Sequence, residues 1–105
     1  MKSFIVVFTT CASKKEAQNI IGALLKKRLI ACANIIGGMK SKFWWKGRID
    51  TAKEILVMMK ARAKDFKAIE KMIMRLHSYD VPEIVAVPIA AAGKSYLKWM
   101  EKEIR

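Results

Sequence analysis

The 105-residue sequence predicts an α+β protein: a ferredoxin-like βαββαβ sandwich with a long hairpin between its second and third strands and a C-terminal helix. The prediction depends first on the order in which strand and helix periodicities follow one another along the chain. It also depends on a turn signal inside one long strand pattern, and on prolines that restrict the last strand to a sheet edge. A chain of this length has room for one hydrophobic core, so we expect a single domain over residues 1–105.

The first strand and the first helix are predicted from two adjacent patterns. The run Ser3–Thr10 is continuously apolar and rich in β-branched residues, which is typical of a central strand covered on both faces. Ser13 and Glu16 then have the spacing of a capping box, in which both side chains satisfy free amides of a helix start. Apolar residues at helical spacing follow, which predicts an amphipathic helix over residues 14–28.

A long hairpin is predicted in the middle of the chain. The period changes to strand spacing over Ile30–Lys46, where residues 39, 41, 43 and 45 alternate with the lysines at 40, 42 and 46, and Gly37-Gly38 interrupts the run as a bulge or a bend. Lys46-Gly47-Arg48 is a hairpin turn signal, and we expect the return strand over Ile49–Arg62.

The last three elements complete the fold. Helical spacing predicts a helix over Asp65–His77 and another from about Ser95. Between them, Val81–Ala90 reads as an edge strand because it carries Pro82 and Pro88. Right-handed crossovers then give the strand order fourth, first, third, second, with two helices on one face of the sheet.

The predicted hairpin is longer than the domain that carries it. A compact chain of this size is about 33 Å across, whereas strands of about 14 residues reach roughly 45 Å. Either a bend at Gly37-Gly38 folds the hairpin back onto its own core, or the overhang packs on another subunit; a dimer, a trimer and larger rings are all compatible with the second case. The overhang carries large apolar side chains, which are Met39, Phe43, Trp44, Trp45 and Ile49.

Two cysteines and one histidine limit the chemistry available to one subunit. Cys11 ends the first predicted strand, whereas Cys32 begins the second at the opposite edge of the sheet, so the two are too far apart for a disulfide. His77 is expected at the same end of the sheet as Cys11, where a thiolate and an imidazole hold a soft metal such as copper if other ligands come from elsewhere. The alternative is that His77 only favours a helix C-terminus, with Cys11 as a small half-buried residue.

A polar loop and one lysine are further candidates for binding. The segment 77–83 brings an imidazole, a phenol and two carboxylates between a helix and a strand, and such loops commonly hold binding groups. Lys60 follows an apolar strand run, where it either pairs with a carboxylate of a neighbouring subunit or simply marks the strand end.

The composition narrows the class of protein. Hydrophobic residues make up 53% and charged residues 29%, and no apolar run approaches the roughly 20 residues of a membrane span. Without a signal-peptide pattern, we expect a soluble, cytoplasmic protein. The net charge of +12, together with basic residues around Trp44 and Trp45, leaves nucleic acid as an alternative partner. The familiar phosphate-loop and hydrolase motifs do not occur, and we expect a binding protein and not an enzyme.

Several segments together resemble the CutA family of divalent-cation-tolerance proteins. The resemblance implies a tight homotrimer in which hairpin arms carrying Phe43, Trp44 and Trp45 join the sheets of different subunits, an architecture similar to that of the PII signalling proteins. The matching stretches run from end to end and are residues 29–36, residues 43–49, Glu54 with Lys60, residues 77–83 and residues 96–99.

The resemblance also implies a function in metal tolerance, especially toward copper, with His77, Cys11 and Cys32 as candidate metal ligands. A PII-like trimer that binds a small anion without metal is the alternative. The clefts between subunits are expected to be lined by six positions, which are Cys32, Trp45, Lys60, His77, Tyr79 and Glu83.

Overall fold

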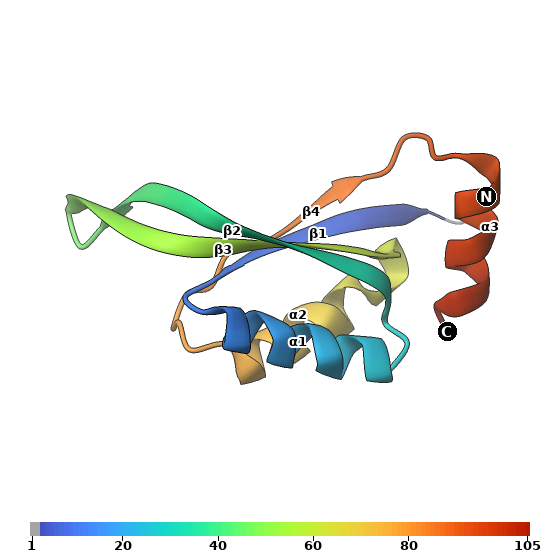
Figure 1. Cartoon of the computed structure of the whole chain (residues 1–105), viewed down its shortest axis with the longest axis horizontal. Helices are drawn as coiled ribbons and strands as arrows, with labels where there is room; N and C mark the ends of the chain where they lie inside the picture. Colours follow the sequence, from blue (N-terminus) through green and yellow to red (C-terminus); the bar gives the residue numbers. More distant parts are fainter. Residues whose placement is uncertain (1–2) are drawn as a thin grey trace.

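The structure is built on a four-stranded antiparallel sheet, from which the β2–β3 hairpin projects at one end (Figure 1). We describe residues 3–105 of a computed structural model; Met1 and Lys2, the first residues of the expected domain, lie outside the described residues. The sheet order is β2-β3-β1-β4, which confirms the predicted order. The strands are β1 (Phe4–Cys11), β2 (Ile30–Trp45), β3 (Arg48–Arg62) and β4 (Ile84–Pro88).

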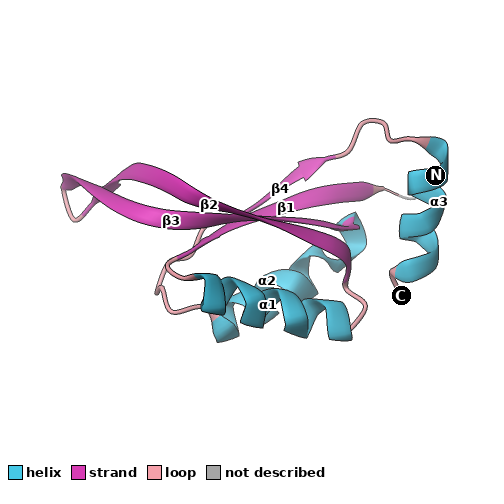
Figure 2. Cartoon of the chain, in the orientation of Figure 1, coloured by secondary structure: helices cyan, strands magenta, loops and turns pink. Residues whose placement is uncertain are grey.

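Two helices cover one face of this sheet, and a third lies beyond its end (Figure 2). The helices are α1 (Lys14–Lys26), α2 (Phe66–Leu76) and α3 (Lys94–Glu103), with a short 3₁₀ turn, η1 (Ala63–Asp65), before α2. α1 and α2 lie side by side below the sheet, as expected for a ferredoxin-like sandwich. The opposite sheet face carries no helix along its length among residues 3–105 (Figure 1).

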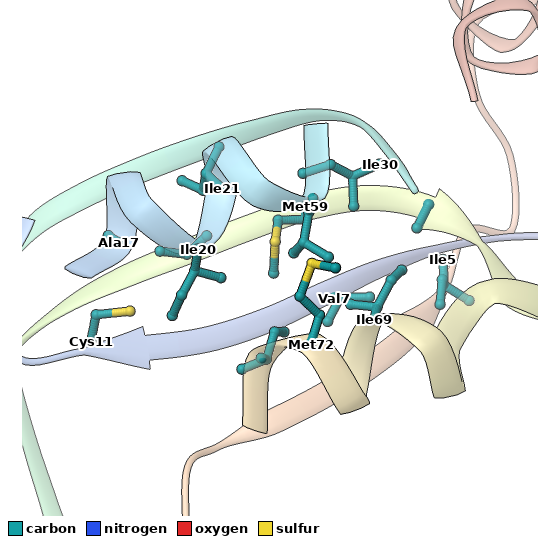
Figure 3. Packing of buried hydrophobic residues seen from close by; sticks show 14 residues of the cluster. Ile5, Val7, Cys11, Ala17, Ile20, Ile21, Ile30, Met59, Ile69 and Met72 are labelled. Atoms are coloured by element: carbon teal, nitrogen blue, oxygen red, sulfur yellow. The ribbon is translucent and has the colours of Figure 1, made fainter. Parts of the chain in front are cut away.

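The core lies between the sheet and the two covering helices (Figure 3). Val7 of β1 and Met59 of β3 point toward Ile20 of α1 and Ile69 of α2, and these side chains are fully buried. Burying each such side chain stabilises the fold by about 1.5–3 kcal/mol. The alternate residues of the strands face the other side, so Val85 of β4 stays exposed while its neighbours pack on the core.

The hairpin of β2 and β3 extends well beyond the helices, and its outer part, residues 39–54, is here called the arm (Figure 1). The molecule is 44 Å long and only 25 Å and 23 Å across, so the alternative of an arm folded back on its own core is wrong. Lys46 (φ 51°) and Gly47 (φ 79°) form the tip, with the two positive φ angles of a tight type I′ turn. The predicted bulge at Gly37-Gly38 is confirmed by a register shift between Ile36 and Met39.

Both covering helices have boundaries that differ from the predicted ones. α1 ends at Lys26 because Arg28 takes a left-handed conformation (φ 58°), and the amide of Leu29 donates to the carbonyl of Leu24 in a Schellman arrangement. The second predicted helix begins with the separate turn η1 and ends at Leu76, so His77 is its C-cap residue.

The fourth strand is shorter than predicted. Val81–Ala90 was expected to be extended throughout, but only Ile84–Pro88 pairs with β1. Pro82 has no amide hydrogen to donate and lies in the preceding loop, which lengthens the connection after α2. The edge position of β4 is as predicted.

Two arginines hold α3 against the end of the sheet. The guanidinium of Arg62 is buried, and its Nη2 donates to the carbonyls of Glu101 and Ile104 at the end of α3. Arg28 donates to both the carbonyl and the carboxylate of Glu103. In the same helix, the hydroxyl of Tyr96 lies 3.2 Å from the thiol of Cys32 in β2.

Candidate functional site

The loop after α2 packs against the end of β1 and the start of α1, and His77 at the beginning of the loop makes hydrogen bonds that hold it there. The imidazole is fully buried, and its Nε2 donates to the carbonyl oxygen of Thr10 at 2.7 Å. Its Nδ1 accepts a hydrogen bond from the amide of Tyr79 at 3.1 Å. These two hydrogen bonds place a proton on Nε2 and use both ring nitrogens.

The carboxylate of Glu16 connects the same loop to the start of α1. It accepts hydrogen bonds from the amide of Ser78 at 2.9 Å and from the amide of Ala12 at 3.4 Å. One oxygen also lies 3.9 Å from Nδ1 of His77. Burial opposes ionisation, but the hydrogen bonds from Ser78 and Ala12 and the nearby imidazole lower the pKa of Glu16 below its ordinary value.

Cys11 lies beneath this loop at the end of β1. Its side chain is fully buried, and its Sγ is 4.0 Å from Nε2 of His77. Burial, together with the negative charges of Glu16 and Glu54, raises the pKa of the thiol to about 11. Cys11 is therefore a protonated thiol near neutral pH.

Cys11, Glu16 and His77 bring three potential metal-ligating atoms within 4.8 Å of one another. Both ring nitrogens of His77 are engaged, since Nδ1 accepts from Tyr79 and Nε2 donates to Thr10, so a metal ion bound by this ring would have to replace one of these hydrogen bonds. The carboxylate of Glu16 accepts two amide hydrogens and keeps further lone pairs. The three residues form an internal hydrogen-bonded node that fixes the loop.

Tyr79 extends this node to the base of the arm. Its hydroxyl donates to Oε2 of Glu54 at 2.9 Å, and its ring lies 4.7 Å from that of His77. Burial and the adjacent carboxylate of Glu54 raise the pKa of Tyr79 to about 12, so the phenol remains a donor over the whole neutral range. Glu54 lies at the base of the arm. The hydrogen bond from Tyr79 to Glu54 therefore connects the loop after α2 to the arm.

Cys32 lies far from Cys11 and His77 within the subunit. It pairs with Lys60 across β2 and β3, whereas Cys11 pairs with Ile55. Five strand positions therefore separate the two cysteines, which is about 16 Å along the sheet. The half-buried thiol of Cys32 lies 3.2 Å from the hydroxyl of Tyr96, and the pKa of that phenol is raised to about 12 by the contact with the thiol and by burial.

The expected site residues thus fall into separate groups within one chain. His77, Tyr79 and Cys11 meet at the node, and Cys32 neighbours Lys60, whose ammonium donates to the side-chain oxygen of Asn34 at 2.8 Å. The other two lie apart: Trp45 is next to the tip of the arm, and Glu83 is exposed just before β4. A cleft that contains all six positions requires more than one copy of the chain.

Two carboxylates at the node were not predicted as site residues. The spacing of Ser13 and Glu16 predicted only a capping box at the start of α1. The side chain of Ser13 does accept a hydrogen bond from the amide of Glu16, as that motif requires. The hydrogen bond between Glu16 and Ser78 spans 62 positions and leaves no local pattern. Glu54 was noted only through the family resemblance, and no spacing in the sequence indicates its contact with Tyr79.

The fold and the node together define a class of protein: a ferredoxin-like subunit with a projecting arm and a loop fixed at the arm's base. A family model for the CutA1 divalent ion tolerance protein matches residues 5–103, and the chain belongs to this family. No helix within residues 3–105 is both long enough and apolar enough to cross a membrane.

Curated relatives and solved structures agree with this assignment. The chain is 36% identical over 101 residues to the divalent-cation tolerance protein CutA of Pyrococcus horikoshii, covering 96% of this chain and 98% of that protein. It is 35% identical over 101 residues to the chloroplastic protein CutA 1 of Oryza sativa, covering 96% of this chain but only 57% of the rice protein. The structure of the periplasmic divalent cation tolerance protein CutA of Archaeoglobus fulgidus superposes with a TM-score of 0.93 at 35% identity, covering 97% and 99% of the two chains.

Proposed function

We propose that this divalent-cation-tolerance protein is a cytoplasmic homotrimer that binds a metal ion or a small ligand in the clefts between its subunits, and that its role is binding and not catalysis. The observation that carries the proposal is the exposed apolar surface of the arm. Trp44, Trp45 and Ile49 project from a 44 Å long molecule that leaves them without cover. Apolar surface gathered in this way marks an interaction site.

The uncovered sheet face supports the same assembly. Val85 and Val87 of β4 and Ile36 of β2 are about half exposed on that side. A closed ring of identical chains buries the arm of one copy on the face of the next and repeats the contact until it closes. A trimer is the ring that the family resemblance implies.

Assembly also brings together the expected cleft residues. Cys32 and His77 lie in different parts of one chain, so a cleft that holds both must take them from neighbouring copies. In that cleft we assign the metal-binding donor to the thiol of Cys32, because Cys11 is buried and both ring nitrogens of His77 make hydrogen bonds. Lys60, Tyr79 and Glu83 complete the polar lining. A thiol ligand favours soft ions, copper above all.

Metal titrations of four proteins test this assignment. Copper(I), the soft ion that a thiolate favours, and zinc(II) are titrated by calorimetry under anaerobic conditions into wild type and the variants Cys32→Ser, Cys11→Ser and His77→Gln, because neither ion oxidises a thiol. We expect Cys32→Ser to weaken binding at least about tenfold, because the soft donor is lost, and Cys11→Ser to leave it unchanged. His77→Gln is a control for the fold of the loop. Unchanged binding by Cys32→Ser, or loss in Cys11→Ser, contradicts the proposal.

A further inference from the structure

The side of α1 and α2 that faces away from the sheet is strongly basic. The buried residues of each helix form one stripe against the core, so the residues on the other side of the helix axis point to solvent. Five exposed cations occupy these outward positions, and they are Lys15 and Lys26 of α1 and Lys67, Lys71 and Arg75 of α2. We call these five residues the basic face.

The chain itself does not neutralise the basic face. Within residues 3–105, none of its five cations belongs to an ion pair. The two helices contain two acids: Glu16 accepts from the amides of Ala12 and Ser78, and Glu70 is a single exposed carboxylate beside five cations. The whole chain has 21 lysines and arginines against 9 acids, so the surplus is available to an anionic partner.

The cations form two rows whose spacing suits a nucleic-acid duplex. Lys15 and Lys26 are about 16 Å apart along α1, and Lys67 and Arg75 are about 12 Å apart along α2. The two helices lie side by side (Figure 2), and packed helices are about 8–10 Å apart. A duplex carries one phosphate charge per roughly 1.7 Å of its axis, with phosphates on both sides of grooves about 6 Å and 12 Å wide. The two rows therefore reach phosphates of both strands.

The shortage of exposed apolar and aromatic side chains on these helices selects the partner. A helix that lies on a membrane inserts an apolar face, but the apolar stripes of α1 and α2 are buried in the core, and the large hydrophobic residues that they expose are Leu25 and Met74. Single strands are held by aromatic rings that stack on bases, whereas Phe66 of α2 packs against the core. The chemistry that remains is contact between cations and the phosphates of a duplex.

We propose that the basic face binds the sugar-phosphate backbone of a nucleic-acid duplex without reading its base sequence. This function is additional to the proposed metal or small-ligand binding and does not depend on it. The proposed assembly uses the arm and the uncovered sheet face, whereas α1 and α2 cover the opposite face (Figure 1). A trimer therefore presents three basic faces to solvent, and failure of either proposal leaves the other intact.

Fluorescence anisotropy of a labelled DNA duplex, titrated with the full-length protein at several salt concentrations, tests the proposal. Five phosphate contacts predict a slope of about −4.5 for log affinity against log salt, which is a loss of roughly 500-fold between about 50 and 200 mM salt. Two duplexes of unrelated sequence should bind within about threefold of each other, because phosphate contacts carry no sequence information. Absence of binding at about 50 mM salt, or a larger sequence preference, overturns the inference.

A matched pair of double variants locates the surface. Lys67→Gln with Lys71→Gln should weaken duplex binding at least about tenfold and make the salt slope shallower by about 2. The control is Lys98→Gln with Lys102→Gln, which removes two exposed lysines at the same four-residue spacing on α3. It should weaken binding less than about threefold, because charges more than about 10 Å from the duplex are screened by salt. Glutamine keeps the helix propensity of lysine, so both variants fold.

Two outcomes of these experiments overturn the inference. Equal loss in the two double variants means that net charge alone, and not the basic face, attracts the duplex. Vesicles of phosphatidylserine and phosphatidylcholine, sedimented with the protein at the same salt concentration, test the membrane alternative. Binding to vesicles that exceeds binding to the duplex assigns the face to a membrane surface instead.

Discussion

Trp44 of β2 lies directly opposite Ile49 of β3 near the tip of the arm, and the two side chains are 72% and 65% exposed. They are a cross-strand pair of the kind that normally packs in a core. Covering both stabilises an interface by about 2–4 kcal/mol for each arm. This pair is therefore the strongest physical reason for an assembly, and the clefts of the proposed function exist only if the assembly forms.

Removing the hydroxyl of Tyr79 tests the bond between the loop and the arm. Tyr79→Phe is expected to lower the free energy of unfolding by about 1–2 kcal/mol, because the hydrogen bond to the buried side chain of Glu54 is lost. Urea unfolding at one fixed protein concentration measures the change. Tyr96→Phe is the matched control, since its hydroxyl meets only the weakly polar thiol of Cys32, and it should cost less than about 1 kcal/mol. Equal losses in both variants would contradict a special role for Tyr79.

Stability is expected to fall in alkali. The pKa of Cys11 is raised from 9.0 to about 11, and that of Tyr79 from 10.0 to about 12. Both groups bind their protons more tightly in the folded state, so their contribution is complete below about pH 9 and is lost as the pH rises toward 12. Urea unfolding between about pH 8 and pH 11 measures the slope. Combining Cys11→Ser with Tyr79→Phe should reduce the slope to the part that comes from the raised pKa of Tyr96, and a wild-type slope of zero or of opposite sign would refute the raised pKa values of Cys11 and Tyr79.

Glu16 gives the opposite dependence in acid. Its pKa is lowered in the folded protein from an ordinary value of 4.5, so its contribution is complete above that pH and is lost as the pH falls through the lower folded value. Glu16→Gln should lower the free energy of unfolding near neutral pH by about 1–2 kcal/mol, because a neutral amide replaces an ionised acceptor of two amide bonds. The difference from wild type should shrink in acid, where both side chains are neutral. A difference that is constant with pH would mean that the charge of Glu16 is unimportant.

The thiol of Cys11 should resist alkylation in the native protein. A pKa of about 11 against 9.0 lowers its thiolate fraction near neutral pH about a hundredfold, and burial blocks access as well. Iodoacetamide labelling of Cys32→Ser, followed by mass spectrometry, isolates this thiol. We expect almost no labelling in buffer and rapid labelling in urea. Fast native labelling would mean that the loop over Cys11 opens.

Local patterns were sufficient to predict most of the architecture. The apolar run of β1, the Lys46-Gly47 turn and the bulge at Gly37-Gly38 each depend on nearby residues, and the strand order follows from crossover handedness. The length of β4 was overestimated, because Pro82 was placed in a strand when it belongs to the loop.

The node was less accessible to prediction, for a physical reason. Cys11 and His77 were expected at one end of the sheet, since topology alone brings them there. Their chemistry depends on contacts with backbone groups and on burial: His77 is satisfied by Thr10 and Tyr79, and Cys11 is enclosed. Such contacts form only after packing is complete, so the sequence indicates that Cys11 and His77 lie near each other but not which hydrogen bonds they make.

Sedimentation equilibrium at micromolar concentration tests the central claim, that the arm is completed by other copies of the chain. The account predicts about three times the 11.9 kDa chain mass for wild type. It predicts a large shift toward lower mass for the double variant Trp44→Lys, Ile49→Lys, and no shift for Lys42→Gln on the same arm. A wild-type particle of 11.9 kDa, or a double variant that keeps the full mass, would contradict the account.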